Sequence, residues 1–225
     1  MKARLVFCFM MTLFCAKAFS QEEKRDMIIF VGQKIEITPI AGKGITTRFD
    51  TIVNGADTTY KLNYFSYDFY QKYYARYKVL QIVQGSLKSD TINFIVLNHI
   101  GSPSFSPYET VLLFVYEKND TLYHELYQYF DVYKTSNNRW AGSYSSRDYQ
   151  GKYDSITVKP ERISFQDEVS FKVKSNDPKW IRYVYPKPYY KIKDGRAIAV
   201  YGNYVEQLAI LRQETVIRER RKPLD

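Results

Sequence analysis

The segment Thr110–Leu126, TVLLFVYEKNDTLYHEL, reads as two β-strands joined by a tight polar turn. Its run Val111–Val115 is apolar at every position, which indicates a strand buried on both faces at the centre of a sheet. The residues Glu117–Asp120 are typical of a hairpin turn. In the second strand, His124 and Glu125 fall on opposite faces because successive side chains of a strand alternate. This pattern predicts a β-dominated fold.

The rest of the chain supports this prediction. It contains 22 Tyr and 14 Phe, residues that suit a pleated, half-buried surface. The segment Thr59–Tyr74 is crowded with aromatic residues and is compatible with either a helix or a strand. Further strands are expected at Met27–Val31, at Lys34–Thr38 after a break at Gly32-Gln33, at Ala75–Val83 and at Asp90–Asn98.

The C-terminal region predicts an amphipathic helix over residues 203–222. Asn203 is a suitable cap with Glu206 three residues later, and Val205, Leu208, Ala209 and Val216 form an apolar stripe. Proline-rich sequence before it predicts an extended linker over residues 183–202. The predicted organisation is therefore a mainly-β domain over residues 21–182, the linker and the helix.

The N-terminal residues 1–20 have the order of a secretory signal peptide. Lys2 and Arg4 precede the apolar run Leu5–Cys15, which is shorter than the roughly 20 residues needed to span a bilayer. Cleavage is expected after Ser20, with Ala18 as the alternative. Lipid attachment at Cys15 is a weaker alternative, because Phe14 replaces the small residue which that processing prefers. We expect export to a periplasm, to the cell surface or to the medium.

Signal removal has consequences for chemistry. Both cysteines lie within residues 1–20, so the mature chain has no disulfide, no cysteine nucleophile and no Cys-ligated zinc. Loss of Lys2, Arg4 and Lys17 lowers the formal net charge from +9 to +6. A basic exported chain favours an anionic glycan or envelope surface over nucleic acid as its partner.

The strings ARYKVLQIVQG (75–85), DTINF (90–94) and YETVLLFV (108–115) resemble the core of netrin/TIMP-like OB-fold modules. Together with Tyr123-His124-Glu125 and Trp140-Ala141-Gly142, they are also similar to uncharacterised secreted proteins of Bacteroidota. The resemblance covers roughly residues 75–142 and implies an OB-like barrel or sandwich. It does not imply protease inhibition, because the N-terminal cysteine of TIMPs has no counterpart at Gln21.

No catalytic motif is present, and no cofactor is expected. The chain lacks a nucleotide-binding glycine loop, a Ser-x-x-Lys motif and a G-x-S-x-G elbow. His99 and His124 are the only histidines and are weak candidates for a metal site. A pair of carboxylates for hydrolysis needs only proximity in space, so a hydrolase of cell-envelope polymer stays as the alternative function.

The densest aromatic cluster suggests a ligand site. Tyr70, Tyr73, Tyr74 and Arg76 could form a stacking platform with positive charge, as OB-folds use for oligosaccharides; Trp140 is a second candidate at a loop. The other interpretation is that these aromatics build the core. We therefore predict a non-enzymatic binding module whose ligand is an envelope glycan or another envelope protein.

Overall fold

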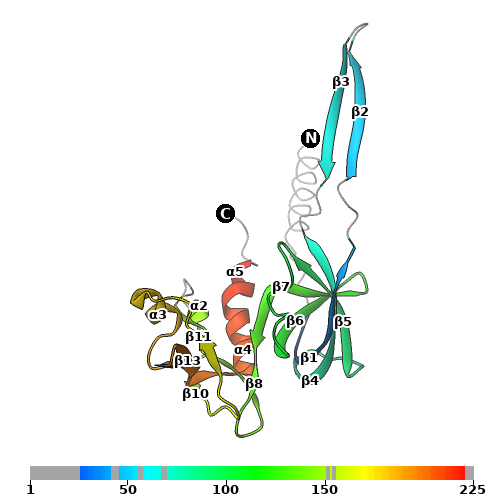
Figure 1. Ribbon diagram of the computed structural model, residues 1–225. Helices are drawn as coiled ribbons and strands as arrows, with labels where there is room; N and C mark the ends of the chain where they lie inside the picture. The colour runs from blue at the N-terminus through cyan, green and yellow to red at the C-terminus, as the bar shows by residue number, and fades with distance from the viewer. Residues whose placement is uncertain are drawn as a thin grey trace, which may run out of the picture.

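Figure 1 shows the computed structural model, which describes residues 26–41, 46–54, 58–66, 70–150, 153 and 156–220. The expected signal peptide and the last residues of the expected helix lie outside this part of the chain. The larger unit is a closed five-stranded barrel. Its strands are β1 (Met27–Ile40), β4 (Gln71–Gln84), β5 (Thr91–Asn98), β6 (Thr110–Lys118) and β7 (Thr121–Asp131).

Around the barrel the strands follow the order β1-β4-β5-β7-β6. All neighbours are antiparallel except β5 and β7, which run parallel. Because β6 returns to lie beside β1, the strands β6-β1-β4-β5 have a Greek-key order. The mainly-β prediction is confirmed, and so is the C-terminal helix.

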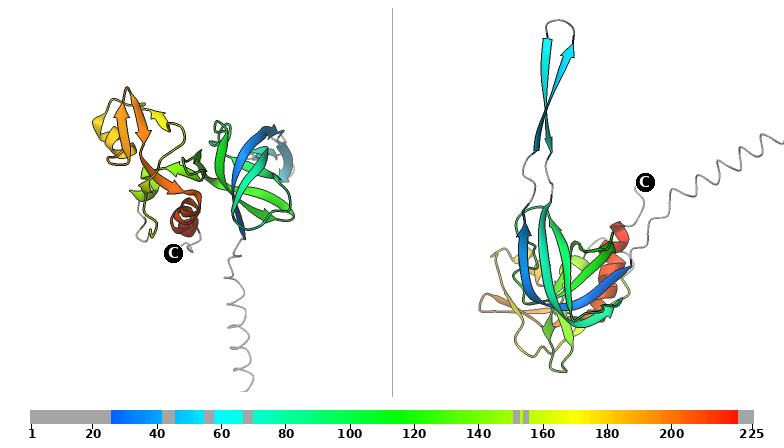
Figure 2. Two further views of the ribbon diagram at one scale, coloured as in Figure 1. Left: turned by 90° about the horizontal axis from the view of Figure 1, so that it is seen from below. Right: turned by 90° about the vertical axis from the view of Figure 1, so that its right-hand side faces the viewer.

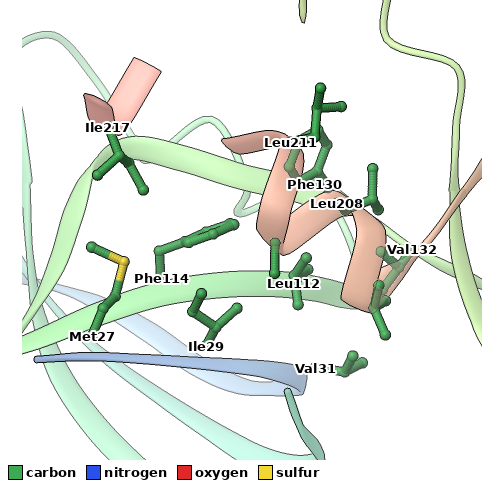
Figure 3. Close-up of a cluster of buried hydrophobic side chains, with 12 residues drawn as sticks. Met27, Ile29, Val31, Leu112, Phe114, Phe130, Val132, Leu208, Leu211 and Ile217 are labelled. Carbon is green, nitrogen blue, oxygen red and sulfur yellow. The ribbon is translucent and has the colours of Figure 1, made fainter. Parts of the chain in front are cut away.

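Strand β6 explains why the run Val111–Val115 is apolar at every position. Val111, Leu113 and Val115 point into the barrel, where they pack with Phe30 and Phe94. Leu112 and Phe114 point outward, against the C-terminal helix (Figure 3). Both faces of the strand are therefore buried, as the sequence predicts.

Strand β1 differs from the prediction at Gly32. It is one continuous strand, with register shifts near Gly32 instead of a break into two. A Cβ atom on Gly32 would lie 2.8 Å from Cε2 of Phe30 and 3.0 Å from Cδ1 of Tyr77. The glycine thus permits close packing inside a bent strand and does not make a turn.

A long hairpin is inserted between β1 and β4. Its strands, β2 (Thr46–Asn54) and β3 (Thr58–Ser66), pair along their whole length and extend away from the barrel (Figures 1 and 2). The undecided segment Thr59–Tyr74 therefore contains strand and no helix in its described part. The side chains of residues 42–69, including Tyr64 and Phe65 of the aromatic cluster, lie outside the described ones.

A smaller lobe follows the barrel and contains two sheets. The first has the order β10-β14-β9-β8 and the second β11-β13-β12. The strands of the first sheet are β8 (Tyr133–Lys134), β9 (Trp140–Ser143), β10 (Glu161–Arg162) and β14 (Tyr201–Tyr204). The second sheet comprises β11 (Ser170–Lys172), β12 (Tyr190–Lys193) and β13 (Arg196–Ala199), and the lobe also holds helices α2 (Ser146–Tyr149) and α3 (Pro178–Val184).

The prediction of an extended linker over residues 183–202 is wrong. This segment contains the end of α3, the strands β12 and β13, and the first half of β14. The physical reason is a buried aromatic cluster: Tyr190 is 4% exposed, and its hydroxyl donates a hydrogen bond to the carbonyl oxygen of Tyr144 at 2.5 Å. The ring of Tyr189 stacks on the ring of Tyr144, with 3.8 Å between the two ring centroids. These contacts fix the proline-rich segment within the lobe.

The C-terminal helix packs between the lobe and the outer face of the barrel. It comprises α4 (Val205–Arg212), a π-helical turn η1 (Gln213–Ile217) and α5 (Arg218–Arg220). Leu208, Leu211 and Ile217 meet barrel residues in one apolar cluster (Figure 3). Ile217 is buried there in place of the expected Val216, because a π turn holds an extra residue and shifts the register.

The start of the helix also differs from the prediction. Asn203 lies in β14, is fully buried and donates to the carbonyl oxygen of Lys159 at 3.0 Å, so it is not the cap. The cap is Tyr204, whose backbone N–H donates to Oε1 of Gln207 at 3.0 Å. Within the part of the chain described here, no helix has the length and apolar content that crossing a membrane requires.

Candidate functional site

A cleft of about 310 Å³ opens where the barrel meets the lobe; we call it the interlobe cleft. Ligand pockets in proteins often lie at such junctions and have volumes from roughly 300 to 1,000 Å³. The cleft combines aromatic and acidic side chains from four separate segments of the chain. It is lined by Tyr108, Glu109, Thr110, Val132, Tyr133, Lys134, Trp140, Gln166, Asp167, Glu168 and Val169.

Short turns and one hairpin place these residues. Tyr108 closes a turn before β6, where its backbone N–H donates to the carbonyl oxygen of Phe105 at 3.1 Å. The hairpin of β8 and β9 sets Lys134 opposite Trp140 in register. The backbone N–H of Gln166 donates to the carbonyl oxygen of Lys134 at 2.9 Å, which holds the loop of Asp167 and Glu168 against this hairpin.

The aromatic side of the cleft is held in place by a half-buried carboxylate. The hydroxyl of Tyr133 donates to Oδ2 of Asp131 at 2.7 Å. Burial raises the pKa of Asp131, and burial together with that carboxylate raises the pKa values of Tyr133 and Tyr108. Both tyrosines therefore keep their protons at neutral pH and remain hydrogen-bond donors.

The rim of the cleft is acidic and polar. Glu109 on the barrel side and Asp167 and Glu168 on the lobe side are exposed carboxylates. Lys134 is the one cation among the lining residues, and its Nζ lies 4.2 Å from the centroid of the Trp140 ring. Three carboxylates against one ammonium favour a neutral or positively charged ligand over an anionic one.

The predicted stacking platform is not assembled. On β4 the side chains alternate, so Tyr73 points into the barrel, 8% exposed, while Tyr74 and Arg76 lie on the outer face. The hydroxyl of Tyr73 lies 3.0 Å from the carbonyl oxygen of Gly101. Tyr70 precedes the strand, is 39% exposed and contacts the ring of His99 edge-on.

Trp140 is the one sequence-predicted candidate that lines the interlobe cleft. Its ring is half-buried and also packs against the apolar cluster beneath the C-terminal helix. Trp140 therefore forms part of the cleft wall and lies far along the chain from the four candidates near β4.

The two histidines occupy different environments. His124 is buried among Phe94 and Phe105, its Nε2–H donates to the carbonyl oxygen of Gln128 at 2.8 Å, and burial lowers its pKa to about 4. His99 is exposed at the end of β5. Among the described residues, no three His, Cys, Asp or Glu side chains gather in a way that could hold a metal ion.

A larger hollow of about 940 Å³ lies at one end of the barrel but is a weaker candidate. Its walls include Asp26, Gly85, Glu117 and Asn119, and no aromatic residue lines it. It adjoins residue 26, where the chain enters from outside the described part.

Sequence reasoning missed Tyr108, Glu109, Tyr133, Lys134 and the loop 166–168. These residues come from segments that only the tertiary structure brings together, and no spacing in the sequence indicates that they converge. The polar turn at Asn137-Asn138 was the one available signal, because a hairpin there sets Lys134 opposite Trp140. No family model, no curated protein and no solved structure matches the chain.

Proposed function

We propose that this protein is an exported, non-enzymatic binding module that takes a neutral or amino-bearing saccharide of the cell envelope into the interlobe cleft. The observation that carries the proposal is the cleft itself, with an aromatic wall of Tyr108, Tyr133 and Trp140 and an acidic rim. Aromatic rings pack against the apolar faces of a sugar ring, and carboxylates accept hydrogen bonds from its hydroxyl groups. The volume suits one or two sugar units.

The interpretation as a binding module has two further supports. The first is the N-terminal sequence of residues 1–20, whose order is that of an export signal. The second is the five-stranded Greek-key barrel, which favours an OB-like fold, an architecture that hosts oligosaccharide and single-strand binding. The acidic rim argues against nucleic acid and against acidic glycans in this cleft.

The alternative function, hydrolysis of a cell-envelope polymer, has one observation in its favour. Glu109 approaches the cleft from the barrel, and Asp167 and Glu168 approach from the lobe. Two carboxylates on either side of a bound sugar are the minimum that glycoside hydrolysis needs. Release of product from a bound oligosaccharide would decide for this alternative.

The experiment is a thermal-shift and calorimetry screen of the full chain purified from an exporting host. The probes are chitobiose, its de-acetylated form, cellobiose and digalacturonate. We expect one of the first three to raise the melting temperature and digalacturonate to have no effect, because a ligand of the native state stabilises it. Each mixture is also checked for cleavage products.

Matched variants locate the binding. Trp140→Ala and Glu168→Gln should abolish the shift, whereas Tyr70→Ala, an exposed aromatic outside the cleft, should retain it. No shift with any of the neutral or amino disaccharides, or a shift that survives both cleft substitutions, would overturn the proposal. Cleavage that is lost in Glu109→Gln or Glu168→Gln would replace binding by hydrolysis.

A further inference from the structure

Positive charge is concentrated in one part of the lobe. Residues 170–196 contain eight Lys or Arg and two Asp, a net charge of +6, which is two-thirds of the formal net charge of +9 of the whole chain. This segment includes α3 and the three-stranded sheet β11-β13-β12. The sheet lies on the side of the lobe remote from the barrel (Figures 1 and 2).

The register of this sheet places the cations on one face. Lys172 of β11 pairs with Arg196 of β13, and Arg196 pairs with Lys193 of β12, so three cations form one row across the sheet. Lys191 lies two residues from Lys193 and shares its face. All four residues are exposed. We call these four residues the basic face.

The other face of the same sheet is apolar. Tyr190 and Ala197 are buried there in the aromatic core of the lobe, and Phe171 packs against them. The sheet therefore presents its cations to solvent because its other face builds the core. This orientation is fixed by the pairing, since a slip of one residue would exchange the two faces.

The row of cations has an energetic cost. Like charges directly opposite each other on paired strands destabilise a sheet. Arg196 donates to Oγ of Ser170 at 2.9 Å and to its carbonyl oxygen at 3.0 Å, which aligns the guanidinium along the face. Among the described residues, no carboxylate forms an ion pair with any member of the basic face. This holds for Asp194 too, although it lies in the turn that joins β12 to β13.

We propose that the basic face docks on an anionic phospholipid surface. The cations spread over three strands, about 5 Å apart from one strand to the next, so they form a two-dimensional array that meets several headgroups at once. A single nucleic-acid strand calls instead for a groove with stacking aromatics, and the basic face carries Ser170 and Ile198 between its cations. Juxtamembrane cations bind anionic lipid in this manner.

The test is co-sedimentation of the full chain with vesicles of phosphatidylcholine and phosphatidylglycerol in a 7:3 ratio, with pure phosphatidylcholine vesicles as the reference. We expect binding to the anionic vesicles alone, and weaker binding as the salt concentration rises. Each cation near the surface contributes roughly a fivefold gain in affinity. The variant Lys172→Gln/Lys191→Gln/Lys193→Gln should therefore bind on the order of 100-fold more weakly.

The matched control removes the same charge from the barrel. Lys72→Gln/Lys78→Gln/Lys88→Gln replaces three exposed lysines and should retain most of the vesicle binding. Equal losses in the two triple variants, or no binding of the wild type to anionic vesicles, would overturn the proposal. So would binding to dextran sulfate without binding to vesicles, because the partner would then be a soluble polyanion. The result does not depend on the saccharide screen.

Discussion

The buried ion pair between Asp148 and Arg212 should be a main determinant of stability. Nη1 of Arg212 lies 2.9 Å from Oδ1 of Asp148, and Nη2 lies 3.3 Å from Oδ2. The guanidinium carbon also lies 4.3 Å from the centroid of the Phe130 ring on β7. One side chain of α4 therefore contacts α2 of the lobe and a strand of the barrel.

The expected loss follows from the burial of both charges. Asp148 is 1% and Arg212 8% exposed, and burial lowers the pKa of Arg212 against the opposing effect of Asp148. Removing one partner leaves the other charge buried and unpaired, which costs about 3–5 kcal/mol. We expect Asp148→Asn and Arg212→Met to lose that much each. The double variant should lose at least 2 kcal/mol less than the sum, because it leaves no unpaired charge.

Urea unfolding followed by far-UV circular dichroism measures these losses. With a slope of roughly 2 kcal/mol per molar urea, a loss of about 4 kcal/mol lowers the midpoint by about 2 M. The control is Arg139→Met, which breaks the exposed pair of Arg139 with Glu206 at 3.1 Å and should cost less than about 1 kcal/mol. Additive losses in the double variant, or a single loss as small as that of the control, would refute this reasoning.

Three further predictions concern the two apolar cores. Burial lowers the pKa of His124 to about 4, below its value of about 6.5 in the unfolded chain. As the pH falls, the unfolded state therefore binds the proton first. The free energy of unfolding should fall by about 2 kcal/mol between pH 7.5 and pH 5. His124→Gln should flatten this dependence in urea titrations, and an unchanged dependence would contradict the burial of His124. Leu208→Ala should lower the free energy of unfolding by about 2–5 kcal/mol, because Leu208 is fully buried. The control Ile210→Ala, at an exposed position of the same helix, should lower it by less than about 1 kcal/mol. Equal losses would contradict the packing of the helix on the barrel. The buried hydroxyl of Tyr77 has no hydrogen-bond partner among the described residues, so Tyr77→Phe should raise the melting temperature, and a clear decrease would reveal a missed partner.

The sequence was sufficient to predict an element where its local pattern agrees with its burial in the tertiary structure. The run Val111–Val115 predicted a strand covered on both faces, and the barrel interior and the helix cover it. The hairpin turn before Thr121 was also predictable from the sequence. Asn119 and Asp120 adopt positive φ angles there, which Asn and Asp tolerate better than most residues.

Prediction failed where a distant partner decides the structure. The sequence of residues 183–202 predicts a linker because it does not show the contacts with Tyr144. In the structure, Tyr189 stacks on Tyr144 and the hydroxyl of Tyr190 donates to its carbonyl oxygen. The aromatic cluster near β4 predicts a platform from composition alone. In the strand, side chains alternate, so Tyr73 lies on the opposite face from Tyr74 and Arg76. Composition also indicated an anionic partner, but it could not show that the acidic cleft and the basic face are separate surfaces.

The fluorescence of Trp140 tests ligand binding in the interlobe cleft most directly. The chain has two tryptophans, so a Trp180→Phe variant leaves Trp140 as the single reporter in the cleft wall. Titration with the disaccharide that gives the largest thermal shift should change its emission, with a saturation midpoint equal to the calorimetric Kd. An unchanged emission while calorimetry still reports binding would contradict the cleft as the site.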